Sequence, residues 1–401
     1  MVTRVRSLSI ALLIVLVVGA VSGQQPKRAR APYIAPLLPA EQAWKITLAA
    51  RPAANGVMDD AAVYVPLEEV AASTEDGAPP PSPAALVALD RQSGTTRWTS
   101  SVSTRLPPLL AHGAIVVATS SGIEALDPPT GRRQWSVALD RPARAPMIAQ
   151  GPLLVTVLEG GELVGVHLER REVVWRRGLG AADRVSMTTD PEAAYLVTGS
   201  RAISVNLSDG TIRWERALDG ELSEPVVDRD RVFIGSTTKS FWSLDTRTGK
   251  DKGWKWNGII FGGAIVGAAV QGNKVYVVSW DNIVRALNRG NGAQEWKRAA
   301  PRPLFPPRVL NGIVAVVGVS PTLSTFRADT GNPVSTWAFP SDLLLQGAPL
   351  IDEPAPYRVA IVAVFRDGQV FGLRPTEMLF KEAPAVPLTV LPGRSLPRET
   401  P

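Results

Sequence analysis

The chain has 401 residues, of which 45% are hydrophobic and 20% charged, as in a globular protein with a large core. It contains no cysteine, which excludes disulfides, thiolate metal sites, cysteine catalysis and lipid attachment through cysteine. With only two histidines, His112 and His167, a histidine-based metal or acid–base site is not expected. The net charge is +6, but no run of Lys and Arg is dense enough to predict nucleic-acid binding.

The first 23 residues have the organisation of a secretory signal peptide. Arg4 and Arg6 precede an apolar stretch at residues 8–18, and small residues follow at 21–23, where a signal peptidase cleaves. An uncleaved membrane anchor is the alternative, although an apolar run of about 14 residues is shorter than the roughly 20 that a bilayer requires. We expect cleavage and a periplasmic or secreted chain with no lipobox cysteine.

Two Pro-rich segments without periodicity flank the rest of the chain. Residues 24–40 are expected to form a linker and residues 375–401 a disordered tail. Between them, residues 41–374 repeat a short motif, in which Asp or Asn is followed by Gly four residues later and by Trp four residues after that. Its clearest copies are Asp90, Gly94 and Trp98; Asp127, Gly131 and Trp135; Asn206, Gly210 and Trp214; and Asn288, Gly292 and Trp296.

Each repeat also contains an apolar run rich in Val, Ile, Tyr or Phe, followed by turn residues, and no stretch shows a helical period. These features predict an all-β chain with four short antiparallel strands per repeat. Repeats of about 40 residues with four strands are typical of propeller blades rather than of solenoid coils.

The count of repeats predicts eight blades. Trp44 precedes the first complete repeat, and the last repeat, residues 348–373, lacks a Trp strand of its own. We therefore expect the Trp44 strand to become the fourth strand of the last blade, which closes the ring and leaves no free sheet edge. In blade seven the motif is displaced by about two residues, and residues 68–83 of blade one form a long insertion between the second and third strands.

The motif residues are expected to be structural. The Asp or Asn accepts bonds from its own turn, Gly allows a positive φ, and the Trp packs between adjacent blades while its N–H reaches a carbonyl. The motif resembles the tryptophan-docking motif of the quinoprotein (PQQ) dehydrogenase propellers, a superfamily that also includes BamB-type factors for assembling outer-membrane β-barrel proteins. The resemblance implies the fold. No cysteine ring, catalytic Asp or calcium ligand of the enzyme branch can be assigned in this sequence.

The repeat does not account for every tryptophan. The surplus lies in blades five and six, at Trp242, Trp280 and one of Trp254 and Trp256, near several lysines. These residues are interpreted either as a partner-binding patch or as extra packing beneath a long connection.

The preferred hypothesis is an exported, monomeric and non-enzymatic propeller, without a cofactor, that binds protein partners in the cell envelope, as in β-barrel assembly. The alternative, also drawn from the resemblance, is a PQQ-dependent dehydrogenase or a propeller that binds PQQ or another small ligand. A secreted or anchored binding module of unrelated purpose is a third possibility.

Overall fold

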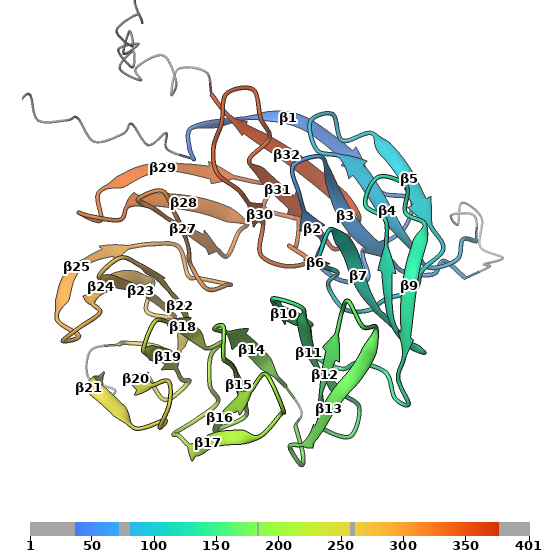
Figure 1. The fold of residues 1–401 in the computed structure, drawn as a ribbon. Helices are drawn as coiled ribbons and strands as arrows, with labels where there is room; N and C mark the ends of the chain where they lie inside the picture. The colour runs from blue at the N-terminus through green and yellow to red at the C-terminus, as the bar shows by residue number, and fades with distance from the viewer. Residues whose placement is uncertain (1–36, 72–80, 183, 257–260, 377–401) are drawn as a thin grey trace, which may run out of the picture. The chain divides into compact units, whose positions relative to one another are not determined.

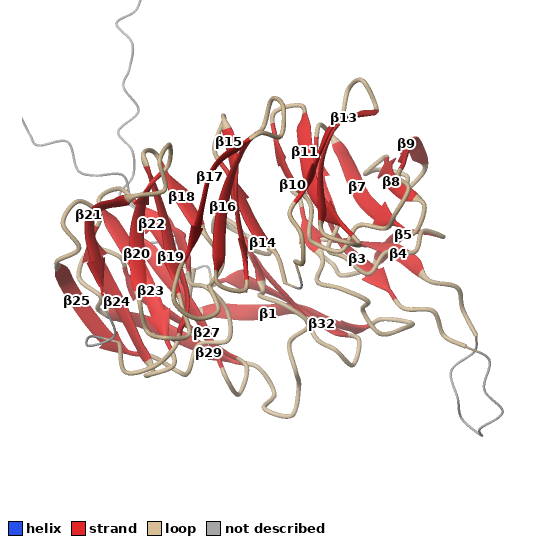
Figure 2. Cartoon of the chain, turned by 90° about the horizontal axis from the view of Figure 1, so that it is seen from below, coloured by secondary structure: helices blue, strands red, loops and turns tan. Residues whose placement is uncertain are grey.

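The computed structural model describes residues 37–71, 81–182, 184–256 and 261–376, and these form eight four-stranded antiparallel sheets arranged as the blades of a ring (Figure 1). Within these residues strands are the regular secondary structure and no helix occurs (Figure 2). In particular, the described residues contain no helix that is long and apolar enough to span a membrane. The predicted all-β, eight-bladed propeller is confirmed.

The strands of each blade are given from the axis outward. Blade 1 comprises β2 (Val57–Met58), β3 (Ala62–Leu67), β4 (Ala85–Asp90) and β5 (Thr96–Ser100). Blade 2 comprises β6 (Leu109–Ala111), β7 (Ala114–Thr119), β8 (Gly122–Leu126) and β9 (Arg133–Ala138). Blade 3 comprises β10 (Ile148–Gln150), β11 (Leu153–Leu158), β12 (Glu162–His167) and β13 (Glu172–Gly178). Blade 4 comprises β14 (Ser186–Thr189), β15 (Ala193–Thr198), β16 (Arg201–Asn206) and β17 (Ile212–Ala217).

The second half of the ring repeats this order. Blade 5 comprises β18 (Val226–Asp228), β19 (Arg231–Gly235), β20 (Phe241–Asp245) and β21 (Asp251–Trp256). Blade 6 comprises β22 (Ile265–Gln271), β23 (Lys274–Ser279), β24 (Ile283–Asn288) and β25 (Gln294–Ala299). Blade 7 comprises β26 (Arg308–Leu310), β27 (Ile313–Gly318), β28 (Thr322–Arg327) and β29 (Pro333–Ala338). Blade 8 comprises β30 (Leu350–Ile351), β31 (Ile361–Val364), β32 (Gln369–Pro375) and β1 (Ala40–Thr47).

The core lies between the blades. The second and third strands of each blade are buried on both faces, as in β3 and β20, because each blade is covered by a neighbour on either side. These strands are therefore continuous apolar runs, whereas the outer strands alternate between buried and exposed residues, as in β17. This burial pattern explains why the apolar runs of the sequence coincide with the second strands.

The N-terminal strand closes the ring as expected. β1 pairs with β32 from Ala40 opposite Pro375 to Thr47 opposite Gln369, and this ladder makes β1 the outer strand of blade 8. Leu37 and Leu38 are buried in the core shared by blades 7 and 8, so the predicted linker, residues 24–40, overlaps the ring at its end. The predicted signal peptide, the remainder of that linker and nearly all of the predicted tail lie outside the described residues.

The two faces of the ring carry different turns. One face, here called the connection face, carries the hairpins between second and third strands together with the connections between blades. Backbone hydrogen bonds link these two kinds of loop, for example from Leu218 N–H to the Ser200 carbonyl at 2.8 Å and from Phe339 N–H to the Pro321 carbonyl at 2.9 Å. The opposite face, the motif face, carries the Asp/Asn-to-Gly turns. The insertion of blade 1 leaves β3 on the connection face, and residues 72–80 within it are not described.

Candidate functional site

The repeated motif forms the joints between blades. Six tryptophans each cover the motif glycine of the following blade, and the indole N–H donates to a carbonyl of the same turn. The bonds run from Trp44 to Arg91 (2.9 Å), Trp98 to Pro128 (2.8 Å), Trp175 to Leu207 (2.7 Å), Trp214 to Thr246 (2.9 Å), Trp254 to Arg289 (2.9 Å) and Trp296 to Ala328 (3.1 Å). Four of the tryptophans predicted to dock, Trp44, Trp98, Trp214 and Trp296, thus contact the turn of the next blade.

Two joints depart from this pattern. Trp135 faces the turn of blade 3, where Arg171 occupies the glycine position at φ 58° and donates its N–H to the His167 carbonyl at 2.8 Å. The His167 ring nitrogen accepts from Arg170 N–H at 3.3 Å, so this histidine replaces the turn Asp. Trp337 has no turn to cover, because ring closure removes the hairpin between the third and fourth strands of blade 8. Its indole nitrogen is buried and has no hydrogen-bond partner among the described residues.

We predict that Trp296→Phe destabilises the ring more than Trp337→Phe. Trp296→Phe loses the hydrogen bond to the Ala328 carbonyl, which keeps a bond from Tyr276 Oη, so it should cost about 0.5–1.5 kcal/mol beyond the lost ring contacts. Trp337→Phe loses no hydrogen bond and should cost only the lost ring contacts. Urea unfolding of both variants measures the difference, and equal midpoints would contradict it.

A buried arginine joins blade 1 to blade 8. The side chain of Arg91 is fully buried, and its guanidinium donates to the Val359 carbonyl (2.7 Å), the Asp59 carbonyl (2.9 Å) and the Asp352 carboxylate (2.9 Å). Burial would raise the pKa of Asp352, but hydrogen bonds from Glu353 N–H and Arg91 hold that pKa below its usual range. The Arg91–Asp352 pair therefore connects blade 1 to blade 8, on the axial side of the β1–β32 ladder that closes the ring.

Arg289 occupies the corresponding position in blade 6, directly after the motif Asn. It reaches back to blade 5, where it pairs with Asp228 and donates to Asp230 at 2.6 Å. Hydrogen bonds from Arg289 and Lys252 hold the pKa of Asp230 well below its usual range, and a bond from Lys252 lowers that of Asp245 to about 2. The joint between blades 5 and 6 thus carries the same kind of arginine bridge as the joint between blades 8 and 1.

The structure does not bring the four candidate patch tryptophans, of which three are surplus to the motif, into one surface patch. Trp242 is 1% exposed in the core between blades 4 and 5, and Trp254 is the docking tryptophan of blade 5. Trp256 is half-buried with its ring centroid 6.1 Å from that of Phe261. Trp280 alone of the four is exposed, at 51%, on the hairpin between β23 and β24. Because third strands are covered on both faces, Trp242 is a packing residue.

Trp280 belongs to a different exposed group. Four of the six large hydrophobic side chains that are exposed in the described ranges lie on the connection face of blades 6–8 and are named here the blade 6–8 apolar surface: Trp280, Leu304, Val319 and Leu344. The Arg302 guanidinium lies 4.9 Å from the centroid of the Trp280 ring, and Val319 N–H donates to the Arg302 carbonyl at 2.9 Å. Exposed aromatic and arginine side chains beside aliphatic ones are typical of protein-binding surfaces.

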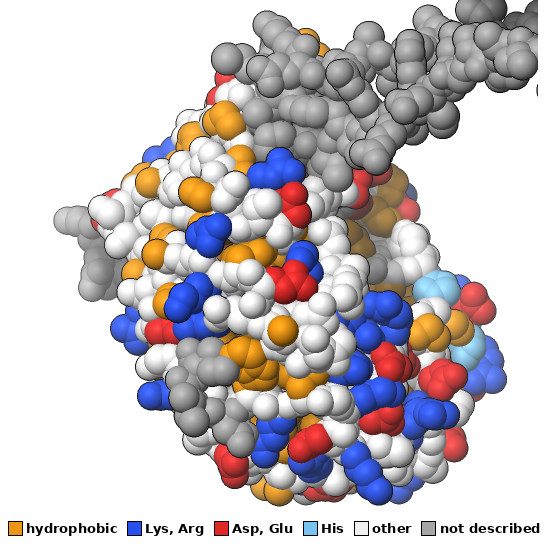
Figure 3. All heavy atoms as spheres, turned by 90° about the vertical axis from the view of Figure 1, so that its left-hand side faces the viewer, with side chains coloured by type: hydrophobic (Ala, Val, Ile, Leu, Met, Phe, Trp, Pro, Cys, Tyr) orange, Lys and Arg blue, Asp and Glu red, His pale blue; other side chains and the backbone are white. Residues whose placement is uncertain are grey.

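The outer rim is mixed in charge. Lys and Arg side chains alternate with Asp and Glu side chains over the side seen in Figure 3, with hydrophobic side chains between them. No area of a single sign dominates this side.

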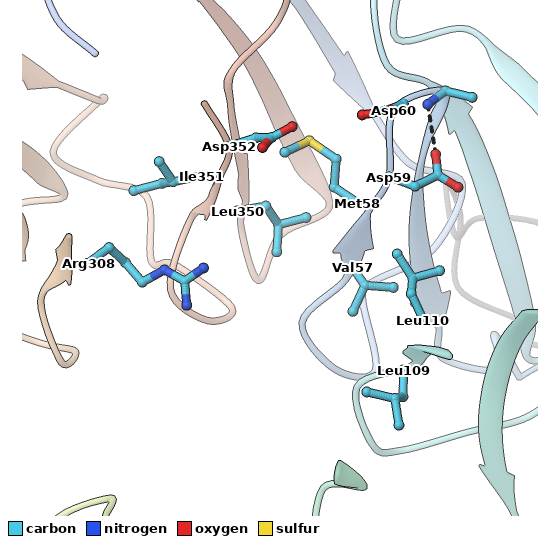
Figure 4. Close-up of a pocket in the computed structure, with 11 residues that line it drawn as sticks. Val57, Met58, Asp59, Asp60, Leu109, Leu110, Arg308, Leu350, Ile351 and Asp352 are labelled. Carbon is cyan, nitrogen blue, oxygen red and sulfur yellow. Dashed lines mark hydrogen bonds between the residues drawn. The ribbon is translucent and has the colours of Figure 1, made fainter. Parts of the chain in front are cut away.

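Hollows lie along the axis of the ring. One, of about 770 Å³, is lined by inner-strand residues of blades 8, 1 and 2 together with Arg308 of blade 7. In Figure 4 the Arg308 side chain extends from β26 into the open space faced by Leu350, Val57 and Leu109, while Asp352 lies above. A second hollow, of about 460 Å³, is lined by the inner strands of blades 5–7 and again by Arg308. Aliphatic and charged side chains therefore both line the hollows of the axis.

In the described part of the chain, no group of three or more His, Asp or Glu side chains is placed to hold a metal ion. A PQQ-dependent activity stays a prediction, and no chemical step is derived through that cofactor.

Comparison with known proteins identifies the family. The sequence profile described as outer membrane protein assembly factor BamB matches residues 41–201, 189–257 and 254–377, which together cover the whole ring. The chain belongs to the BamB family.

Individual relatives of this BamB-family propeller are distant. It is 24% identical to the outer membrane protein assembly factor BamB of Yersinia pestis over 172 residues, covering 38% of this chain and 43% of that protein. It is 28% identical to BamB of Vibrio cholerae over 135 residues, covering 28% of this chain and 34% of that protein. The chain therefore matches less than half the length of these relatives.

Solved structures show the same fold. The crystal structure of BamB from Moraxella catarrhalis superposes with a TM-score of 0.59 at 16% identity, covering 84% of this chain and 99% of that one. The computationally designed Ika8 protein superposes with a TM-score of 0.62 at 12% identity, covering 86% and 99%. At such identities the resemblance supports the architecture alone, and the function must be argued from the family and from this chain's own surfaces.

Proposed function

We propose that this BamB-family propeller is a non-catalytic scaffold of the cell envelope that binds a protein component of outer-membrane β-barrel assembly through the blade 6–8 apolar surface. The family match supports the assembly role, because the relatives are named outer membrane protein assembly factors. The predicted signal peptide at residues 1–23 supports a periplasmic location, and the protein acts there as a monomeric ring.

The exposed apolar surface is the observation that carries the proposal. Leu344 is 65% exposed and Trp280 51%, and covering such side chains with a partner removes apolar area from water. The Arg302 guanidinium stacked on Trp280 adds a rigid contact that suits a well-packed interface. The loop that carries Leu304 is tied to blade 7 by backbone bonds from Leu304 N–H to the Val317 carbonyl and from Val319 N–H to the Arg302 carbonyl, both at 2.9 Å, so this part of the surface is preformed.

Affinity capture tests the proposal. Tagged full-length protein, incubated with envelope extracts of its source cells, should recover components of the barrel-assembly machinery, identified by mass spectrometry. The double substitution Trp280→Ser with Leu344→Ser should reduce that recovery at least about tenfold, since interface anchors typically contribute 2 kcal/mol or more.

The matched control is Ile212→Ser, which removes another exposed hydrophobic side chain, 41% exposed, at the start of β17 near the motif face. Its recovery should equal that of the unmodified protein. Recovery of no assembly component by the unmodified protein, or equal losses in both variants, would contradict the proposal. A change in the absorption spectrum on adding PQQ with Ca²⁺ would instead favour the cofactor-binding alternative.

A further inference from the structure

Two oppositely charged side chains line the 460 Å³ hollow, and one of them, Arg308, also borders the 770 Å³ hollow. The other is Glu224. Neither the Glu224 carboxylate nor the Arg308 guanidinium makes a hydrogen bond or an ion pair within 4 Å with any residue in the described ranges. Other carboxylates on the axis are already bonded, such as Asp59 to Tyr64 Oη at 2.8 Å and Asp352 to Arg91. Glu224 and Arg308, both exposed, are the two charged residues that line this hollow, beside Thr188.

The local sequence fixes the positions of both groups. Glu224 precedes Pro225 at the start of β18, and Arg308 follows Pro306 and Pro307 at the start of β26. Proline restricts its own φ and the conformation of the residue before it, so these backbones are held in place. The inner strand between them, β22, contributes small side chains at Ala268 and Ala269, which leave the space between blades 5 and 7 open.

The two charges interact across the hollow without touching. Partial burial raises the pKa of Glu224, and the positive charge of Arg308 opposes that increase. A carboxylate and a guanidinium that influence each other but remain beyond ion-pair distance leave a gap with one positive and one negative end. The wall between them is apolar, with Val226, Val270 and Leu310 among its residues.

We propose that this hollow binds a small apolar zwitterion, such as a short peptide with aliphatic side chains. Its carboxylate pairs with Arg308, its ammonium group pairs with Glu224, and its aliphatic side chains cover the apolar wall. A volume of about 460 Å³ lies within the range of small-ligand sites. The charge-assisted contacts at the two ends fix the orientation of the ligand. This site is separate from the blade 6–8 apolar surface and does not depend on the proposed partner.

Isothermal titration of the full chain at pH 7.5 with three peptides tests the site. The probe is L-leucyl-L-leucine. The matched controls are L-leucyl-L-leucinamide, which lacks the carboxylate, and N-acetyl-L-leucyl-L-leucine, which lacks the ammonium group. The unmodified dipeptide should bind at least about tenfold more tightly than either control, because each control lacks one charge-assisted contact.

Two variants test which side chain binds the carboxylate of the peptide and which binds its ammonium group. Arg308→Gln should bind leucyl-leucine no more tightly than leucyl-leucinamide, but still more tightly than the acetylated peptide. Glu224→Gln should bind leucyl-leucine no more tightly than the acetylated peptide, but still more tightly than the amide. Arg366→Gln, on the hairpin between β31 and β32, should leave all three affinities unchanged. No binding of leucyl-leucine at millimolar concentration, or equal affinity for the three peptides, would overturn the proposal without any variant being needed.

Discussion

Replacing Arg91 with alanine should lower the free energy of unfolding by about 3 kcal/mol. The substitution removes the side-chain donor to the Val359 and Asp59 carbonyls and opens a space between blades 8 and 1. It also removes one donor to the Asp352 carboxylate, which still accepts from Arg358 at 2.7 Å and from Glu353 N–H at 2.8 Å. Removing one partner of a buried ion pair typically costs about 3–5 kcal/mol, and the low end applies because the Asp352 side chain is 37% exposed. Urea unfolding followed by both tryptophan fluorescence and circular dichroism measures the loss.

The control for Arg91 is Arg133→Ala. The Arg133 side chain is 62% exposed and faces Glu124 at 3.6 Å, so its removal should change stability by less than about 1 kcal/mol.

The pH dependence of stability gives a second test of the Arg91–Asp352 pair. In the folded protein the pKa of Asp352 lies below its usual value. Its ionised carboxylate therefore stabilises the fold at pH values above the usual pKa, and this stabilisation is lost as the pH falls through the pKa of the folded state. The difference in the free energy of unfolding between the unmodified protein and Arg91→Ala should therefore become smaller as the pH falls. A difference that does not change with pH would contradict the role given to Asp352.

The second large effect concerns a motif glycine. Gly131→Ala should destabilise the ring by about 2–4 kcal/mol. Gly131 has φ 69°, where a side chain costs about 1–2 kcal/mol, and an added Cβ would lie 2.5 Å from Cε3 of the docked Trp98. The indole must move, and overpacking of this kind adds about 1–3 kcal/mol.

The matched variant Gly113→Ala, in the same blade, separates the cost of backbone strain from the cost of the clash with Trp98. The φ of Gly113 is 71°, but no heavy atom outside its chain neighbours lies within 4 Å of an added Cβ. Gly113→Ala should therefore cost only about 1–2 kcal/mol, the backbone strain alone. Thermal and urea unfolding compare the two variants, and a shift in Trp98 fluorescence should appear only in Gly131→Ala. Equal destabilisation would show that the contact with Trp98 adds nothing.

Most of the architecture could be predicted because one local motif determines both the turn and the interblade contact. The spacing of Asp127, Gly131 and Trp135 identifies a turn, and the absence of a Trp strand after residue 373 implies closure by β1. The displacement of Trp337 was also visible in the sequence. Its register confirms this: Ser335 lies opposite Thr325, where the other blades place their tryptophan, and Trp337 lies two residues further along.

The candidate functional surfaces were predicted less well, because the sequence does not show which side chains are buried or which distant residues come close in the fold. Trp242 was grouped with surface candidates, but it lies on a third strand that neighbouring blades cover on both faces. Arg91 is not part of the predicted motif; its recurrence as Arg289, directly after a motif Asp or Asn, is the signal that the sequence contains. Glu224 and Arg308 come together only because blades 5 and 7 flank the same inner strand, a proximity that no local pattern records.

The closing ladder also has a mechanical consequence. Ala40, the first residue of β1, lies opposite Pro375, the last residue of β32, so both ends of the ring leave from the same end of one antiparallel pair. Tension applied between these ends would load one pair of residues at a time rather than the whole ladder at once. The ring therefore resists pulling forces least where it is closed, and Trp44, docked on blade 1 farther along the same strand, is the first strong point that an opening ladder would meet.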